Sequence, residues 1–215
     1  MITENELRRR ADEGPPEVQY DLGWRYSAGH DVQKDDEEAV KWLRKAAEQG
    51  HTKSQNILGM MYAVGHGVPR NDVEAAKWFR MAAEQGLSQG QHSLAAMYYY
   101  GNGVPQDYME AVKWFRKAAD RGLAQAQHDL GVMYADGHGV PQDYVEAHMW
   151  WNLAAAQGNE EAHEKRDIVA KMLTASQVAD AQCRAREKVE VSVESILAEI
   201  KQPPEITDVT AGQRD

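Results

Sequence analysis

Apolar and small residues recur along this chain with a period of 36 residues. Five residue types keep that step in four successive copies. They are Trp42, Trp78, Trp114 and Trp150; Leu22, Leu58, Leu94 and Leu130; Tyr26, Tyr62, Tyr98 and Tyr134; Ala39, Ala75, Ala111 and Ala147; and Gly50, Gly86, Gly122 and Gly158. A period of this length indicates structural units that stack on one another and share one continuous core.

Each period contains two helical patterns joined by two kinds of turn. The first helix ends at Gly65, Gly101 or Gly137, where a G-x-G-V-P loop begins. Glycine suits the left-handed residue that closes a helix, and the proline that follows prevents the helix from continuing. The second helix contains K-W-F-R or a similar segment and ends at Gly86 or Gly122. The period therefore predicts one helical hairpin.

Capping signals mark the start of each second helix. An aspartate or asparagine is followed by a glutamate three residues later at four places, Asp35 and Glu38, Asn71 and Glu74, Asp107 and Glu110, and Asp143 and Glu146. In a capping box the first side chain accepts from the backbone of the second residue, and the second side chain accepts from the backbone of the first. We expect this reciprocal pair of hydrogen bonds in every repeat.

The two ends of the repeat array differ from its middle. Residues 3–13, opened by Thr3 and Glu6, predict a single leading helix in which Glu6 stands where the repeats have tryptophan. Thr174 and Gln177 predict the start of a long final helix, from Ser176 to about Lys201. The predicted division is an N-terminal capping helix at 1–14, repeats at 15–158, C-terminal capping helices at 159–202 and a disordered tail at 203–215.

The repeated pattern is A-x-x-x-L-G-x-M-Y-x-x-G-x-G-V-P-x-D-x-x-E-A-x-K-W-x-R-x-A-A-x-x-G, over roughly residues 7–163. It closely resembles the Sel-one-like repeat family, relatives of the tetratricopeptide repeats. The resemblance implies an all-α fold, a right-handed superhelical solenoid of antiparallel helix pairs with 36-residue repeats. It also implies that the first helix of each pair lines a concave groove.

In function, the resemblance implies a bacterial adaptor in protein complexes, with roles that include membrane-protein quality control, signalling, host interaction and immunity to toxins. We therefore expect a non-catalytic scaffold that binds a peptide or protein segment in its groove. Two alternatives stay open, a weak β-lactam-binding hydrolase and a structural self-assembly protein. The relatives linked to β-lactams are rich in paired cysteines, whereas this chain has only Cys183.

Residues that differ between copies at equivalent positions of the first helices are candidates for binding. Four rows follow from the positions that face the groove in tetratricopeptide relatives: Tyr20, Asn56, His92 and His128; Trp24, Met60, Ala96 and Val132; Ser27, Ala63, Tyr99 and Ala135; and Ala28, Val64, Tyr100 and Asp136. The predicted protein-binding groove consists of Tyr20, Trp24, Asn56, Met60, His92, Tyr99, Tyr100, His128 and Asp136. Aromatic side chains are good anchors for a peptide. The alternative is that these rows pack on neighbouring helices or face solvent.

Charge and composition narrow the partners. The formal net charge of -10 disfavours nucleic acid, which is bound by clustered lysine and arginine, and favours a neutral or basic protein. There is no apolar run near the roughly 20 residues of a membrane helix, so no membrane span is expected. The first residues lack the apolar stretch of a secretory signal, which predicts a cytoplasmic protein, or an exported one if a leader precedes this sequence.

Catalytic and metal-binding motifs are missing from the sequence. The eight histidines form no H-x-x-x-H or H-E-x-x-H pair, and neither G-x-S-x-G nor a Cys/His motif for nucleophilic catalysis occurs. His66 and His138 occupy a loop position that Asn102 fills in the copy between them, so we expect them to be interchangeable there. The sequence therefore predicts no catalytic residues, no metal site and no cofactor.

Overall fold

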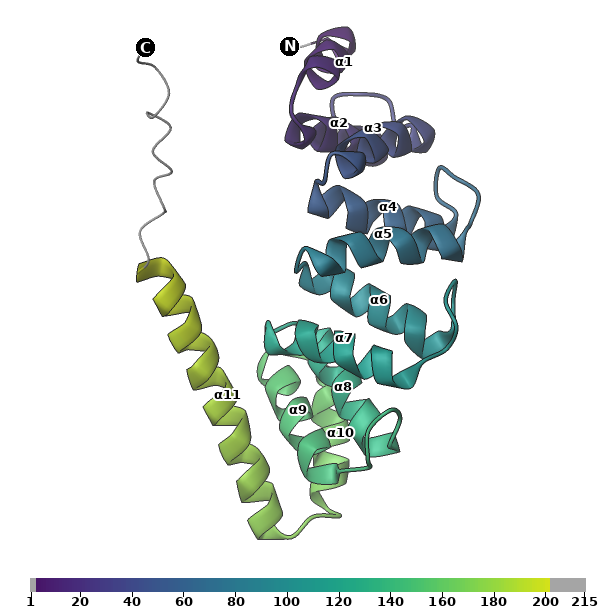
Figure 1. Cartoon of the computed structure of the whole chain (residues 1–215). Helices are drawn as coiled ribbons and strands as arrows, with labels where there is room; N and C mark the ends of the chain where they lie inside the picture. The colour runs from purple at the N-terminus through teal and green to yellow at the C-terminus, as the bar shows by residue number, and fades with distance from the viewer. Residues whose placement is uncertain (1–2, 202–215) are drawn as a thin grey trace, which may run out of the picture.

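The computed structural model describes residues 3–201 and the side chains as far as residue 191. In this part the chain forms helices and no strand (Figure 1). The helices are α1 (Glu4–Glu13), α2 (Pro16–Ala28), α3 (Asp36–Glu48), α4 (Thr52–Val64), α5 (Asp72–Glu84), α6 (Ser88–Tyr100), α7 (Tyr108–Asp120), α8 (Ala124–Asp136), α9 (Tyr144–Ala156), α10 (Glu160–Ala170) and α11 (Ala175–Lys201). The tail predicted at 203–215 lies outside the described residues.

The helices pair in chain order, and the pairs stack along one axis. Figure 1 shows them following one another from α2 to α10, and each helix from α2 to α9 packs on the helix before it and the helix after it. The even-numbered helices α2, α4, α6 and α8 are the first helices of the repeats, and α3, α5, α7 and α9 are the second. The predicted fold, an all-α solenoid of antiparallel helix pairs with a 36-residue repeat, is confirmed.

Small residues allow the two helices of each hairpin to approach closely. A Cβ atom added to Gly59 would lie 2.7 Å from the ring of Phe79, and one added to Gly131 would lie 2.6 Å from Trp151. Leu58 and Leu130, one residue earlier, are fully buried. The glycine and the large aromatic residue therefore fill complementary parts of one interface.

An arginine and a tyrosine join each repeat to the next. The guanidinium of the arginine, in α1 or a second helix, donates to the tyrosine hydroxyl of the first helix that follows and lies 5.3 to 5.8 Å from the ring centroid. The four pairs are Arg8 and Tyr26, Arg44 and Tyr62, Arg80 and Tyr98, and Arg116 and Tyr134. A cation over an aromatic ring is attracted to its negative face, so each pair stabilises the contact between repeats.

Only half of the predicted capping box forms. Asn71 Oδ1 accepts from the backbone N–H of Glu74 at 3.1 Å, as predicted, and the aspartate caps do the same. The prediction that the backbone N–H of Asn71 donates to the Glu74 carboxylate is wrong. This N–H donates instead to the carbonyl of Tyr62 at 2.9 Å and so closes the G-x-G-V-P loop. The Glu74 carboxylate instead accepts from Lys77 at 2.6 Å.

The second glycine of each loop lies directly on the preceding repeat. Gly67 has a φ of +70°, and an added Cβ atom would overlap the carbonyl of Asp36. In the first repeat Asp31 occupies the equivalent position with a φ of +62°. Among the described residues no earlier repeat packs there, so the side chain of Asp31 meets no such obstacle.

Different contacts finish the two ends of the stack. At the N-terminal end, α1 forms hydrogen bonds within itself. Arg9 and Arg10 donate to the Glu6 carboxylate and lower its pKa to about 2. At the other end α11 packs along α9. Lys188 donates to Asp120 at 2.9 Å and lies 4.5 Å from the ring centroid of Trp150. Trp150, the last of the four repeated tryptophans, is thus covered by α11 where another repeat would otherwise follow. The exact division into repeats and caps stays a prediction.

Candidate protein-binding site

One stripe of exposed and half-exposed side chains runs along each first helix. Its positions are spaced by four, three and four residues, which places them on one face of a helix with 3.6 residues per turn. We call this set the first-helix stripe, and it consists of Glu17, Asp21, Trp24 and Ala28; Lys53, Ile57, Met60 and Val64; Gln89, Ser93, Ala96 and Tyr100; and Gln125, Asp129, Val132 and Asp136.

Two of the four predicted rows lie in the first-helix stripe. Trp24 is 47% exposed, Met60 52% and Tyr100 68%, and Asp136 is exposed at the end of α8. These residues are accessible to a partner, as a groove residue must be. Each belongs to a row whose residue type changes from repeat to repeat.

The other two predicted rows are less accessible. The row of Tyr99 is half-buried in all four repeats. In the remaining row Asn56 and His128 are buried, and Tyr20 and His92 are half-buried. Tyr20 packs on the ring of His51 with the centroids 4.7 Å apart, and the Asn56 amide donates to the Met60 sulfur at 3.8 Å. This row therefore supports the exposed stripe from below, and direct access to a partner is restricted at Asn56 and His128.

A histidine–aspartate–histidine cluster lies under the part of the stripe that α6 and α8 form. Asp129 Oδ2 is 2.7 Å from His92 Nε2, and Asp129 Oδ1 is 3.0 Å from His128 Nδ1. Burial raises the pKa of the Asp129 carboxyl, but the hydrogen bonds and charges of the two histidines together hold it below its usual value. Asp129 therefore joins α6 to α8 through a charge-assisted contact.

The His92 ring packs on an aromatic ring of α7, and the backbone of His128 is held by a hydrogen bond. The His92 ring lies 5.4 Å from the ring of Phe115. The carbonyl of His128 accepts from the indole N–H of Trp151 at 3.1 Å, whereas its Nε2 atom is 3.7 Å from Glu161, too far for a hydrogen bond. The cluster is a structural support beneath the stripe, with the free edge of His128 facing the carboxylate of α10.

The same cluster does not converge on a metal ion. Among the described residues, no group of three or more histidine, cysteine, aspartate or glutamate side chains has the arrangement to hold one. His92 and His128 each turn one nitrogen toward a different oxygen of Asp129. The carboxylate therefore occupies the space between the two rings.

Four aromatic rings gather where α6, α7 and the last G-x-G-V-P loop meet. Tyr99 lies 4.8 Å from Tyr100 in an edge-to-face arrangement and 5.3 Å from Tyr108. His138 stacks on Tyr108 with the centroids 4.6 Å apart and the planes 6° from parallel. Burial raises the pKa of Tyr99, while Tyr100 stays exposed at the edge of the cluster.

His66 and His138 have different partners, and their interchangeability stays a prediction. His66 Nε2 lies 2.7 Å from a carboxylate oxygen of Asp36, whereas His138 stacks on Tyr108. Asp36 and Tyr108 are equivalent first residues of second helices. The contact of each loop histidine thus depends on the first residue of the second helix in the preceding repeat, a carboxylate for His66 and an aromatic ring for His138.

Sequence reasoning missed Asp129 and the row to which it belongs. That row, Asp21, Ile57, Ser93 and Asp129, lies three residues before the row of Trp24 and Val132 and shares its face. The helical spacing alone places this row on the same face as Trp24, so the sequence could have revealed it. The groove positions of tetratricopeptide relatives do not include this row.

Cys183 is exposed on α11 and is not activated. Its thiol donates to the Glu187 carboxylate at 3.5 Å, and this hydrogen bond together with the negative charge raises the pKa of the thiol. A reactive cysteine requires a lowered pKa.

None of the described helices combines the length and the apolar character needed to cross a membrane.

Comparison with known proteins agrees with this architecture. The family model of the Sel1 repeat matches residues 16–51, 52–87, 88–123 and 124–159. A crystal structure of a Sel1 repeat protein from Oxalobacter formigenes is 33% identical with a TM-score of 0.71, over 85% of this chain and 77% of that one. A search of curated proteins gives no match.

A second solved structure is a protective antigen of uropathogenic Escherichia coli strains with the SLR fold. It is 29% identical with a TM-score of 0.58, and the match covers 97% of this chain and 53% of the antigen, so the chain spans about half the length of that protein. Both solved relatives are bacterial. Proteins with these repeats are generally non-catalytic helical scaffolds. The four matched repeats and the shared architecture show that this chain belongs to the Sel1 repeat family.

Proposed function

We propose that this chain is a non-catalytic scaffold that binds a protein segment along the first-helix stripe, with Tyr100 of the stripe and the adjacent Tyr99 near the centre of the contact. Sel1 repeat proteins are generally protein-interaction scaffolds. The finer assignment, to this surface and these residues, rests on the side chains that the stripe presents.

The observation that carries the proposal is the exposure of large apolar side chains on one stripe. Trp24, Met60 and Tyr100 are about half-exposed or more, on three successive first helices. Tryptophan and tyrosine are enriched among residues that dominate binding energy, because they bury a large area with few rotatable bonds. Tyr100 is also held in place by its edge-to-face contact with Tyr99.

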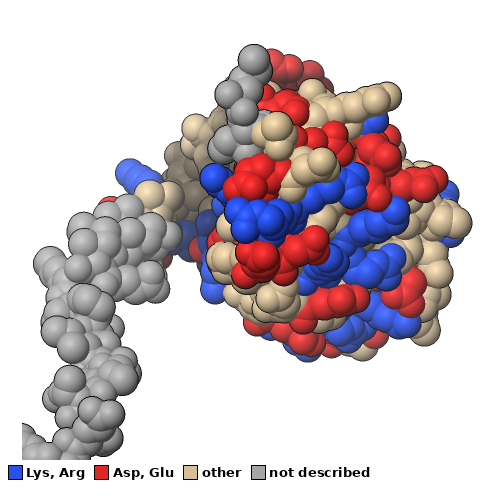
Figure 2. Space-filling view, turned by 90° about the horizontal axis from the view of Figure 1, so that it is seen from above, with Lys and Arg blue, Asp and Glu red and all other residues tan. Residues whose placement is uncertain are grey.

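The charge of the stripe favours a neutral or basic segment. The stripe contains the carboxylates of Glu17, Asp21, Asp129 and Asp136, and Lys53 is its only lysine or arginine. On the end of the molecule seen from above, by contrast, acidic and basic side chains are interspersed (Figure 2). The local excess of carboxylates would attract a basic segment and repel an acidic one.

The test is a quantitative pull-down with Tyr99→Ala/Tyr100→Ala beside the wild-type protein. We expect the double variant to bind its partners at least about 2 kcal/mol more weakly, which is roughly 30-fold in the dissociation constant. The matched control is Met109→Ala on α7, since Met109 is 71% exposed but lies on a second helix.

Circular dichroism establishes that both variants remain folded. The control should retain all partners. If the folded double variant retained partners as well as the control does, binding would have to lie on another surface, such as the second helices or α11.

A further inference from the structure

Buried glutamines link the repeats in a regular way. Gln55, Gln91 and Gln127 occupy equivalent positions on the first helices, and each amide N–H donates to an alanine carbonyl of the preceding second helix at 3.1 to 3.2 Å. The side-chain oxygen of Gln55 accepts from the amide of Gln85 at 2.7 Å, and that of Gln127 accepts from Gln157 at 2.8 Å.

The same pair occurs at the N-terminal end, where Gln49 donates to the oxygen of Gln19 at 2.6 Å. Three of the four equivalent positions thus hold two glutamine side chains joined amide to amide. In each case the second glutamine follows the last residue of a second helix.

Arg121 breaks this series. It stands where the other three repeats have Gln49, Gln85 and Gln157. Gln91 is 4% exposed, and its side-chain oxygen has no hydrogen-bond partner among the described residues. A buried acceptor without a partner is destabilising, so this oxygen needs a donor from elsewhere.

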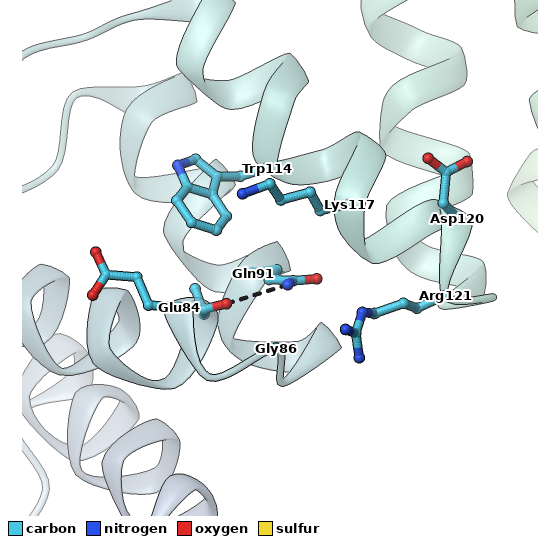
Figure 3. Close-up of a pocket in the computed structure, with 8 residues that line it drawn as sticks. Glu84, Gly86, Gln91, Trp114, Lys117, Asp120 and Arg121 are labelled. Carbon is cyan, nitrogen blue, oxygen red and sulfur yellow. Dashed lines mark hydrogen bonds between the residues drawn. The ribbon is translucent and has the colours of Figure 1, made fainter. Parts of the chain in front are cut away.

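A pocket of about 540 Å³ opens at this position, between the C-terminal ends of α5 and α7. Figure 3 shows Gln91 between Gly86 below and Lys117 above, with its oxygen turned toward the side of the pocket on which Arg121 lies. Lys117 is held over Trp114, with its nitrogen 4.0 Å from the ring centroid.

The guanidinium of Arg121 packs over Gly86, where an added Cβ atom would lie 3.0 Å from it, and forms no ion pair with the described residues. Its N–H groups are therefore available at the mouth of the pocket. The pocket thus combines a buried acceptor, Gln91, with an exposed donor, Arg121.

We propose that this pocket binds a primary carboxamide, the side chain of a glutamine or asparagine in a partner protein segment. The amide N–H would donate to the Gln91 oxygen, and the amide carbonyl would accept from Arg121. The molecule supplies the precedent, because a carboxamide N–H reaches the equivalent oxygen at 2.6 to 2.8 Å in the three other repeats.

This site is separate from the first-helix stripe and goes beyond the proposed function. Its lining comes from α5, the start of α6 and α7. None of its residues belongs to the stripe. The two sites can therefore be tested independently in the same protein.

The test is an NMR titration of the full chain with N-acetylglutamine methylamide, following the indole N–H signal of Trp114. We expect a saturable shift at concentrations up to about 100 mM, since a ligand with two or three hydrogen bonds binds weakly. N-acetylglutamate methylamide is the matched ligand control, because its ionised side chain has no N–H to offer Gln91. An equal response to both compounds would overturn the carboxamide assignment in favour of an anion site.

Two variants exchange the arrangements of the repeats, so that the glutamine pair is restored beside Gln91 in one variant and removed beside Gln19 in the other. Arg121→Gln supplies the missing amide and should abolish the Trp114 response. Gln49→Arg should create a response at Trp42, because Lys45 lies over Trp42 at 4.4 Å just as Lys117 lies over Trp114. Tyr99→Ala/Tyr100→Ala should respond like the wild-type protein, even if the stripe proposal fails.

The proposal would be contradicted if the wild-type protein gave no saturable shift. It would equally be contradicted if Arg121→Gln responded as the wild-type protein does. Either result would show that the pocket does not bind a carboxamide through Gln91 and Arg121.

Discussion

Tyr98 and Tyr100 are two residues apart in α6, yet they belong to different parts of the molecule. Tyr98 stands at a position that is tyrosine in all four repeats, and its hydroxyl accepts from Arg80 of the preceding second helix at 2.8 Å. Tyr100 stands where the other repeats have alanine, valine and aspartate, and it is 68% exposed. The difference teaches that contact with the neighbouring repeat fixes a residue type, whereas exposure on the stripe leaves it free to vary.

The largest effect is expected for the repeated residues of the stack. Trp114 is 7% exposed and its indole N–H donates to Glu110 at 3.2 Å. Trp114→Ala should lower the free energy of unfolding by about 3 to 5 kcal/mol, since it removes a buried aromatic side chain. Urea denaturation followed by circular dichroism measures this change. An unfolding midpoint close to that of the wild-type protein would show that Trp114 is not part of the core.

A smaller loss is expected where a loop lies on its neighbour. Gly67→Asp places in an internal repeat the residue that Asp31 provides in the first one. The new side chain would meet the carbonyl of Asp36 in a left-handed backbone conformation, so we expect a loss of roughly 2 to 3 kcal/mol. Asp31→Gly is the matched control and should change stability by less than about 1 kcal/mol. Thermal melting of both variants separates the two cases, and equal losses would contradict the role of the preceding repeat.

The smallest effect concerns pH. His148 is buried, and burial lowers its pKa below the ordinary value of 6.5. Below pH 6.5 the unfolded chain takes up a proton that the folded chain resists, so His148 reduces stability as the pH falls from 6.5 through the folded pKa. His148→Val, which matches Val40 and Val112 of other repeats, should flatten this dependence.

Melting temperatures between pH 7 and pH 5 check this prediction. His163→Ala is the comparison variant, because it removes a histidine that is exposed on α10. A slope in His148→Val equal to that of the wild-type protein would show that the titration of His148 is not coupled to folding.

The sequence predicts the stack well because repetition averages over local ambiguity. One copy of the G-x-G-V-P loop is a weak signal, but several copies at equal spacing place the helix boundaries closely. The long final helix, expected from Ser176, begins at Ala175. Contacts that recur in every repeat are thus encoded by residues that recur in every repeat.

Contacts made by residues that vary between repeats were harder to predict. Asp129 links His92 to His128 only because α6 and α8 are neighbours, and no other repeat has this arrangement. The missing partner of Gln91 likewise appears only when Arg121 is compared with the glutamines that occupy its position elsewhere. The stripe itself depends on which face of each first helix remains uncovered, and this is a property of the assembled stack.

The most direct test of the account compares the stability of Tyr98→Ala and Tyr100→Ala in parallel urea denaturations. Tyr98→Ala removes a half-buried ring and the partner of Arg80, so we expect it to lower the free energy of unfolding by about 2 kcal/mol or more. Tyr100→Ala removes a largely exposed ring and should change stability by less than about 0.5 kcal/mol. Equal losses in the two variants would contradict the division between a repeated stack and a variable, exposed stripe.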